Sequence, residues 1–214
     1  MFDLTLSFDN GPEPTVTPQV LDSLRARGLR STFFTIGRKL AVPAGAALAR
    51  QAYEEGHWIG NHTWSHGTPL GELAETGHSS GEILDTQAAI GELAHPLRLF
   101  RPFGGGGHLD RRLLNAEAVR TLRAGGFTCV LWNAVPRDWA DPEGWCETAL
   151  RQIAERPWTL LVLHDLPTGA MAHLDRFLDA AAAAGARFRQ DFPPDCVPIR
   201  GGEVVGDLSG MVMG

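Results

Sequence analysis

Short apolar or β-branched runs alternate with longer amphipathic stretches along the 214-residue chain. The short runs are bounded by turn residues and predict strands. We expect these strands at 3–8, 31–36, 58–61, 97–101, 127–133 and 159–164. The longer stretches predict helices at 17–27, 44–55, 80–94, 110–124, 142–155 and 172–184. This alternation is typical of an α/β protein with a mostly parallel sheet.

The number of strand–helix units indicates how the sheet closes. Six or seven units exceed what a small open sheet needs, yet the chain is shorter than the about 250 residues of a full eight-fold barrel. We therefore predict a distorted or incomplete (β/α) barrel of about seven parallel strands, built as a single domain over residues 1–214. From Arg187 the chain is rich in proline, glycine and aspartate, so we expect extended surface structure with a local strand at 197–200.

Composition and charge argue against several classes of protein. The net charge is −6 with scattered basic residues, which argues against a nucleic-acid partner. The spacing of Cys129, Cys146 and Cys196 suggests neither a disulfide framework nor a thiolate metal site. No apolar run approaches the about 20 residues of a membrane span. The start MFDLTLSFDNGP lacks leader features, so we expect a cytoplasmic location, or an extracytoplasmic one if a leader was removed.

Unusual polar residues follow the predicted strands. In chain order they are Asp9, Asn10, His62, His66, Arg101, Asp138, Trp139 and His164. The carboxyl ends of parallel strands and the loops after them converge at one end of an α/β fold. We therefore expect these residues, although distant in sequence, to share one pocket.

The segment HTWSH carries the clearest metal-binding signal. A spacing of four residues on a helical turn or tight loop places His62 and His66 about 5–6 Å apart at Cβ, within reach of one ion. A carboxylate or amide oxygen must complete such a site. The remaining histidines have no partner at ligand spacing and are interpreted as surface or core residues: His57, His78, His95, His108 and His173.

Two further pairs of charged residues are predicted from their positions. Asp9 ends a buried strand, and Arg101 can supply the cation that a buried carboxylate needs. Asp138 can hydrogen-bond the ring of His164 and orient it or hold it protonated. The alternatives are a surface cation at Arg101 and a turn or helix cap at Asp138.

Five segments, in order, resemble the motifs of the polysaccharide deacetylases, the NodB-homology or chitin-deacetylase-like carbohydrate esterases. SFDNGP is similar to T-F-D-D-G-P, and HTWSH matches H-[ST]-x-x-H. FRPFG, RDW and LVLHD resemble R-P-P-Y-G, the D-W motif and L-x-L-H-D. The segments run from Ser7 to His164, about three quarters of the chain. Any one motif is weak evidence, but five in the family's order are strong evidence.

The resemblance implies a distorted barrel and a metal-dependent hydrolase. Its substrate would be an N-acetylated or O-acetylated sugar or polysaccharide, from which it removes the acetyl group. By position, Asp9 would be the general base held by Arg101. His164 would be the general acid, tuned by Asp138.

The resemblance also assigns the metal ligands and the pocket wall. His62, His66 and the residue at position 10 would bind the metal, most simply Zn²⁺, with Co²⁺ or Mn²⁺ as alternatives. The backbone amide of Phe103 would help bind the oxyanion. Trp139 and Leu163 would line the pocket for the acetyl methyl group.

Asn10 is the main departure, because the family's usual residue here is a second Asp. An amide oxygen can still coordinate a metal but removes one negative charge, so we predict weaker binding. Val135 and Phe103 also replace a commonly acidic residue and the family's Tyr. Two alternative functions remain: a catalytically silent carbohydrate-binding relative, and a cytoplasmic hydrolase of another non-peptide amide.

Overall fold

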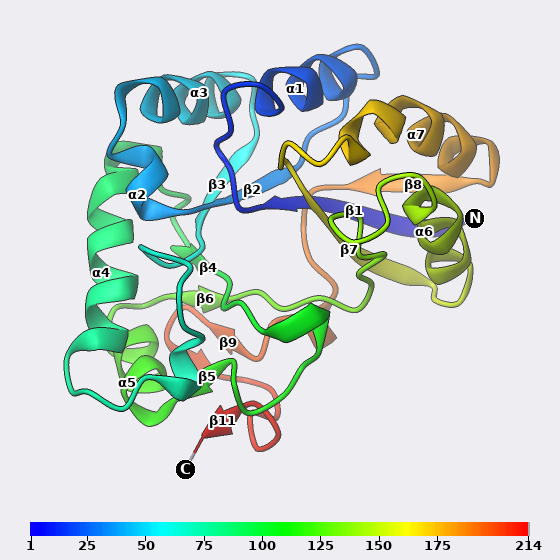
Figure 1. Cartoon of the computed structure of the whole chain (residues 1–214). Helices are drawn as coiled ribbons and strands as arrows, with labels where there is room; N and C mark the ends of the chain where they lie inside the picture. Colours follow the sequence, from blue (N-terminus) through cyan, green and yellow to red (C-terminus); the bar gives the residue numbers. More distant parts are fainter. Residues whose placement is uncertain (214) are drawn as a thin grey trace.

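A curled, mostly parallel sheet forms the centre of the protein, as a computed structural model of residues 1–213 describes it (Figure 1). Its central strands lie in the order β6-β4-β3-β2-β1-β7 and are all parallel. They are β1 (Phe2–Asp9), β2 (Thr32–Thr35), β3 (Trp58–Asn61), β4 (Leu99–Phe100), β6 (Thr128–Cys129) and β7 (Trp158–His164). Each of the six overlaps a predicted strand, although β4 and β6 are shorter than expected.

The sheet closes on itself through an irregular segment after β6. Ala134 forms an isolated parallel bridge to Leu161 of β7. Beside it, the Asn133 side-chain oxygen accepts a 2.8 Å hydrogen bond from the Leu160 N–H. A side chain therefore replaces part of the regular ladder here, and the predicted distorted (β/α) barrel is confirmed.

The C-terminal part adds strands at both sides of the barrel. The first half of β1 pairs with β8 (Ala186–Arg189), and the second half pairs with β2. On the β6 side lie antiparallel β9 (Ile199–Arg200) and β10 (Glu203–Val204). A separate pair joins β5 (Leu114–Asn115) to β11 (Val212–Met213). The strand expected at 197–200 corresponds to β9, whereas the other four were not predicted. The pairing of β8 with β1 and of β5 with β11 is long-range, and β10 forms a short hairpin with β9.

Among residues 1–213 there are seven α-helices. They surround the sheet (Figure 1). They are α1 (Thr17–Arg25), α2 (Gly37–Leu40), α3 (Pro43–Glu54), α4 (His78–Ile90), α5 (Ala116–Ala124), α6 (Trp145–Ala154) and α7 (Leu174–Ala183). The predicted start of α5 at residue 110 is wrong. Asn115 caps this helix by accepting a 2.8 Å hydrogen bond from the Ala118 N–H, which defines its first turn. No helix among residues 1–213 is long and apolar enough to cross a membrane.

The pairing of β1 with β7 places the two ends of these strands side by side. Seven residue pairs hold this parallel register, from Asp3 opposite Trp158 to Asp9 opposite His164. Outward-facing side chains of both strands, including Phe8, pack with α7 in the main core cluster. Burial of this apolar layer fixes the register, and the register brings Asp9 next to His164.

Candidate active site

The last residue of β1, Asp9, forms a buried ion pair with Arg101. The distance from Arg101 Nη1 to Asp9 Oδ1 is 2.8 Å, and their side chains are 0% and 5% exposed respectively. The guanidinium also donates to Ser7 Oγ and to the carbonyl oxygens of Val130 and Leu131. These partners satisfy the buried cation and hold it in one orientation.

The environment of Asp9 keeps its carboxylate ionised. Burial alone would raise the pKa of Asp9, but the charge of Arg101, with a smaller contribution from His164, outweighs burial and lowers it. Arg101 also stacks over the ring of Phe34 at 4.0 Å. The fixed Arg101 thus keeps Asp9 in the ionised form, which can accept a proton.

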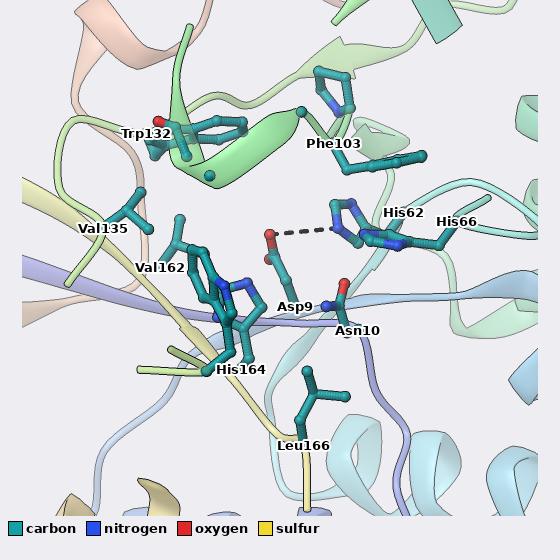
Figure 2. Close-up of a pocket in the computed structure, with 15 residues that line it drawn as sticks. Asp9, Asn10, His62, His66, Phe103, Trp132, Val135, Val162, His164 and Leu166 are labelled. Carbon is teal, nitrogen blue, oxygen red and sulfur yellow. Dashed lines mark hydrogen bonds and ion pairs between the residues drawn. The ribbon is translucent and has the colours of Figure 1, made fainter. Parts of the chain in front are cut away.

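The histidines of HTWSH lie together in a tight loop after β3. Their ring centroids are 5.0 Å apart, and both His66 and the intervening Thr63 have left-handed backbone conformations. The Nδ1–H of His62 donates to the Arg101 carbonyl oxygen at 2.8 Å, which leaves Nε2 with its lone pair facing Asp9 Oδ2 at 3.6 Å. Figure 2 shows both rings beside Asp9 and Asn10.

Both imidazoles are held neutral. Burial is the main cause that lowers the pKa of His62. Burial and the neighbouring His62 ring lower the pKa of His66 to about 3. Neutral imidazole is the form that ligates a metal, because a protonated ring has no free lone pair.

Asn10 supplies the third possible ligand. It has a left-handed φ of 76°, and its side-chain Oδ1 is buried without a hydrogen-bond partner among residues 1–213. A buried amide oxygen without a donor is costly, so it marks a place for a cation or another donor. No cluster of three His, Cys, Asp or Glu ligands occurs in the described part of the chain. The donor set that fits a divalent cation is therefore two imidazoles and one amide oxygen.

His164 and Asp138 form the second buried pair of the site. Asp138 Oδ1 accepts from His164 Nδ1–H at 2.8 Å, and Asp138 Oδ2 accepts from the His164 backbone N–H at 2.8 Å. Burial would lower the pKa of His164, but the hydrogen bond and charge of Asp138, aided by the charges of Asp9 and Asp165, raise it. Trp139 packs edge-on against the imidazole at 4.6 Å. The hydrogen bond to Asp138 and the contact with Trp139 thus fix the orientation of the ring and of its Nε2 atom.

Asp165 supports the loop that carries Asp9 and Asn10. It is fully buried, and its carboxylate accepts a hydrogen bond from the Thr17 hydroxyl. A Cβ added to Gly11 would overlap the Asp165 carboxylate, so any side chain there would displace that carboxylate. Burial raises the pKa of Asp165 to about 7. The glycine of SFDNGP and the aspartate of LVLHD thus fit against each other.

The residues at the strand ends surround one cavity of about 290 Å³. Figure 2 shows Asp9, His62 and Asn10 on one side of it and His164 on the other. Phe103 covers the His66 ring with a stacked contact of 3.9 Å. Six of the eight residues expected to share one pocket line this cavity, whereas Arg101 and Asp138 pair with Asp9 and His164 outside its wall.

A family model described as polysaccharide deacetylase matches residues 3–128, more than half of the chain. A peptidoglycan-N-acetylglucosamine deacetylase of Bacillus cereus is 35% identical over 172 residues, which span 76% of this chain and 72% of that protein. The chain belongs to the polysaccharide deacetylase family. The predicted class of enzyme, a hydrolase of this family, is therefore confirmed.

Solved structures of this polysaccharide deacetylase family share the fold. A family 4 carbohydrate esterase from Streptomyces lividans, in complex with acetate, is 26% identical, with a TM-score of 0.74 over 92% of this chain and 97% of that one. A family 4 acetyl xylan esterase from Clostridium thermocellum, in complex with a cobalt ion, is 26% identical, with a TM-score of 0.70 over 87% of each chain.

The structure corrects the pocket wall that we predicted for this polysaccharide deacetylase. Leu163 is 0% exposed and packs in the main core cluster, not in the cavity. Successive side chains of a strand point to opposite faces, so Val162 and His164 face the cavity instead. Trp139 lines the cavity as expected. Eight wall residues were not predicted: Pro102, Gly104, Gly106, Gly107, Trp132, Val135, Val162 and Leu166.

The other histidines lie outside this cavity, as predicted. His57 is buried, accepts a hydrogen bond from the Ser31 N–H, and has its pKa lowered to about 4, chiefly by burial. His95 packs against Trp58, with ring centroids 4.5 Å apart. None of the remaining three belongs to the cavity wall: His78, His108 and His173.

Proposed function

We propose that this polysaccharide deacetylase is a metal-dependent hydrolase that removes an acetyl group from an N-acetylated sugar. The observation that carries the proposal is the unpartnered buried oxygen of Asn10, which shares one cavity with the His62 and His66 rings and with the oppositely tuned Asp9 and His164. A ligand set, an ionised carboxylate and an imidazolium in one cavity are the parts that amide hydrolysis by water requires.

Asn10 Oδ1, His62 Nε2 and the His66 ring would hold the metal. A divalent cation held there would supply polarisation of the amide carbonyl and a lower pKa for the attacking water. Two imidazoles and one amide oxygen suit a divalent cation of intermediate softness. We infer Zn²⁺, or alternatively Co²⁺ or Mn²⁺. The neutral amide of Asn10 gives this set no formal negative charge, so we expect its affinity to be weak compared with an aspartate at position 10.

Asp9 would accept a proton from the attacking water. Arg101 keeps Asp9 ionised at neutral pH and fixes the direction of its free Oδ2, since Oδ1 is already bound to the guanidinium. A carboxylate with a lowered pKa is a weak base, so its effectiveness rests on position more than on basicity. This placement beside the histidines is the reason to assign the role to Asp9.

His164 would give a proton to the departing amine. Its raised pKa favours the imidazolium, and the bond to Asp138 leaves Nε2 as the donor toward the cavity. The site therefore separates its two proton-transfer duties by environment, with a guanidinium at the base and a carboxylate at the acid.

The Phe103 backbone N–H would stabilise the developing oxyanion. Phe103 lies in the cavity wall, and its N–H makes no hydrogen bond to another residue among 1–213. A preorganised backbone donor at a reacting carbonyl is worth about 10²–10³ in rate in comparable oxyanion holes. The aromatic side chain has a separate place, stacked on His66.

The inferred substrate class rests on the family and on the wall of the cavity. The relative from Bacillus cereus is named as acting on N-acetylglucosamine of peptidoglycan. The apolar groups of Val162, Leu166 and Trp139 offer a surface for an acetyl methyl group. An O-acetylated sugar is the second candidate, because the relative from Clostridium thermocellum is named as an acetyl xylan esterase.

Acetate release from tetra-N-acetylchitotetraose tests the proposal. We expect release with added Zn²⁺, Co²⁺ or Mn²⁺, loss with a chelator, and recovery when the metal is returned. Asn10→Asp should increase the rate at limiting metal. Release by Asn10→Asp but not by the parent would favour a silent carbohydrate-binding relative, and no release by either variant with any metal would overturn the proposal.

A further inference from the structure

A second cavity of about 540 Å³ adjoins the active-site cavity. The two cavities share four wall residues, namely Gly106, Gly107, Trp132 and Val135. The two cavities therefore lie side by side, and a sugar chain with its acetyl group at the active site would extend past these shared residues. The neighbouring sugar of the same chain would then lie in the second cavity.

Arg137 stands at the wall of the second cavity as an exposed cation. Its guanidinium carbon is 5.9 Å from the ring centre of Trp139, the residue that packs against His164. The ion pairs of residues 1–213 include none to Arg137. The other cation of this wall, Arg156, is already paired with Glu155 at 3.4 Å.

The backbone holds Arg137 in an unusual conformation. Its φ is 60°, in the left-handed region that arginine rarely adopts. Two backbone N–H groups, from Ala140 and Asp141, donate to the Arg137 carbonyl oxygen at 2.9 and 3.0 Å. The next residue, Asp138, is fixed by its two bonds to His164. The start of the arginine side chain is thus set by the same turn that orients the proposed acid.

We propose that Arg137 recognises a carboxylate on the sugar next to the one that is deacetylated. The inference rests on the proposed deacetylase function and specifies its substrate as an acidic glycan. A guanidinium matches a carboxylate with two parallel hydrogen bonds, and an unpaired arginine is available to form them. Asp195 and Glu155 also line the second cavity, so the carboxylate must bind at the Arg137 side of it.

A matched pair of ligands isolates the charge. One is a tetrasaccharide of alternating N-acetylglucosamine and N-acetylmuramic acid with free lactyl carboxylates, and the other is the same molecule with those carboxylates converted to amides. Dissociation constants by calorimetry and kcat/KM by acetate release are measured for the parent, Arg137→Gln and Arg137→Lys. Arg120→Gln is the control, because Arg120 is exposed on α5 and lines neither cavity.

We expect the parent to prefer the acidic ligand by about tenfold, as a charge-assisted pair predicts. Arg137→Gln should remove most of this preference, Arg137→Lys should keep part of it, and Arg120→Gln should leave it unchanged. The inference is overturned if the parent shows no preference, if neither ligand binds, or if Arg137→Gln retains the parent's preference while both ligands weaken together. Preference in binding without acetate release would support Arg137 recognition and refute the deacetylase proposal.

Discussion

Two buried ion pairs face the same cavity with their charges reversed. At the end of β1, the carboxylate of Asp9 faces the cavity and the cation of Arg101 stands behind it. At the end of β7, the imidazole of His164 faces the cavity and the carboxylate of Asp138 stands behind it. The rear partner is 0% exposed in both pairs.

This reversal shows how a fold assigns acid and base duties. Arg101 helps to lower the pKa of Asp9, whereas Asp138 helps to raise the pKa of His164. The two groups are therefore both charged near neutral pH, one ready to accept a proton and the other ready to donate one. The buried rear partner thus reinforces the role of the front group in each pair.

Replacing the rear cation should have the largest effect on stability. Arg101→Met leaves Asp9 buried without its counterion, so we expect the free energy of unfolding to fall by about 3–5 kcal/mol. Urea denaturation followed by circular dichroism measures this change.

Arg25→Met is the matched control for that loss. Arg25 forms exposed pairs with Asp22 and Glu55, so its replacement should barely move the denaturation midpoint. The double variant Asp9→Asn with Arg101→Met should recover part of the lost stability. Equal midpoints for Arg101→Met and Arg25→Met would show that the buried pair does not hold the base side together.

Substitutions at two neighbouring residues of β7 should distinguish the face of this strand that packs in the core from the face that lines the cavity. Leu163→Ala opens a space in the core, and we expect it to lower the free energy of unfolding by about 2–5 kcal/mol. Val162→Ala should instead raise KM for acetylated oligosaccharides with a smaller loss of stability. Thermal denaturation and steady-state kinetics distinguish the two, and a larger KM change for Leu163→Ala would restore that residue to the pocket wall.

Neutralising the rear carboxylate should change the pH dependence. The raised pKa of His164 keeps the imidazolium present above the ordinary value of 6.5, so acetate release should fall only as pH rises through that higher pKa. Asp138→Asn removes the charge, so the fall should begin about one pH unit lower. At a pH on the alkaline limb the rate should drop by up to about tenfold. A pH–rate profile with an unmoved alkaline limb would contradict the role of Asp138.

Much of the fold follows from local patterns in the sequence. The alternation within β1 and the turn residues around β3 predict both strands to within a residue. The start of α5 could not be found in this way, because the apolar residues Leu113 and Leu114 fit a helix as well as a buried strand. Leu114 instead pairs with Val212, a contact between segments far apart in sequence.

The same reasoning explains what was found of the site. Motif residues at strand ends could be predicted to converge, since parallel strands place their carboxyl ends together. The face of β7 could not be predicted, because WTLLVLH is nearly continuously apolar and gives no alternation to tell Val162 from Leu163. A binding role for Arg137 could not be predicted from the sequence, because only the structure shows the cavity beside this exposed arginine.

Asn10 lies beside Asp9 in the same cavity, and its role is tested most directly by titrating Zn²⁺ into the parent, Asn10→Asp and Asn10→Leu by calorimetry. We predict one Zn²⁺ per chain, bound about tenfold or more tightly by Asn10→Asp because the ligand set gains a negative charge. Asn10→Leu, which keeps the bulk but has no ligand atom, should bind more weakly than the parent. Equal affinity for the parent and Asn10→Leu, or no binding by the parent at millimolar Zn²⁺, would contradict a metal site built on this amide.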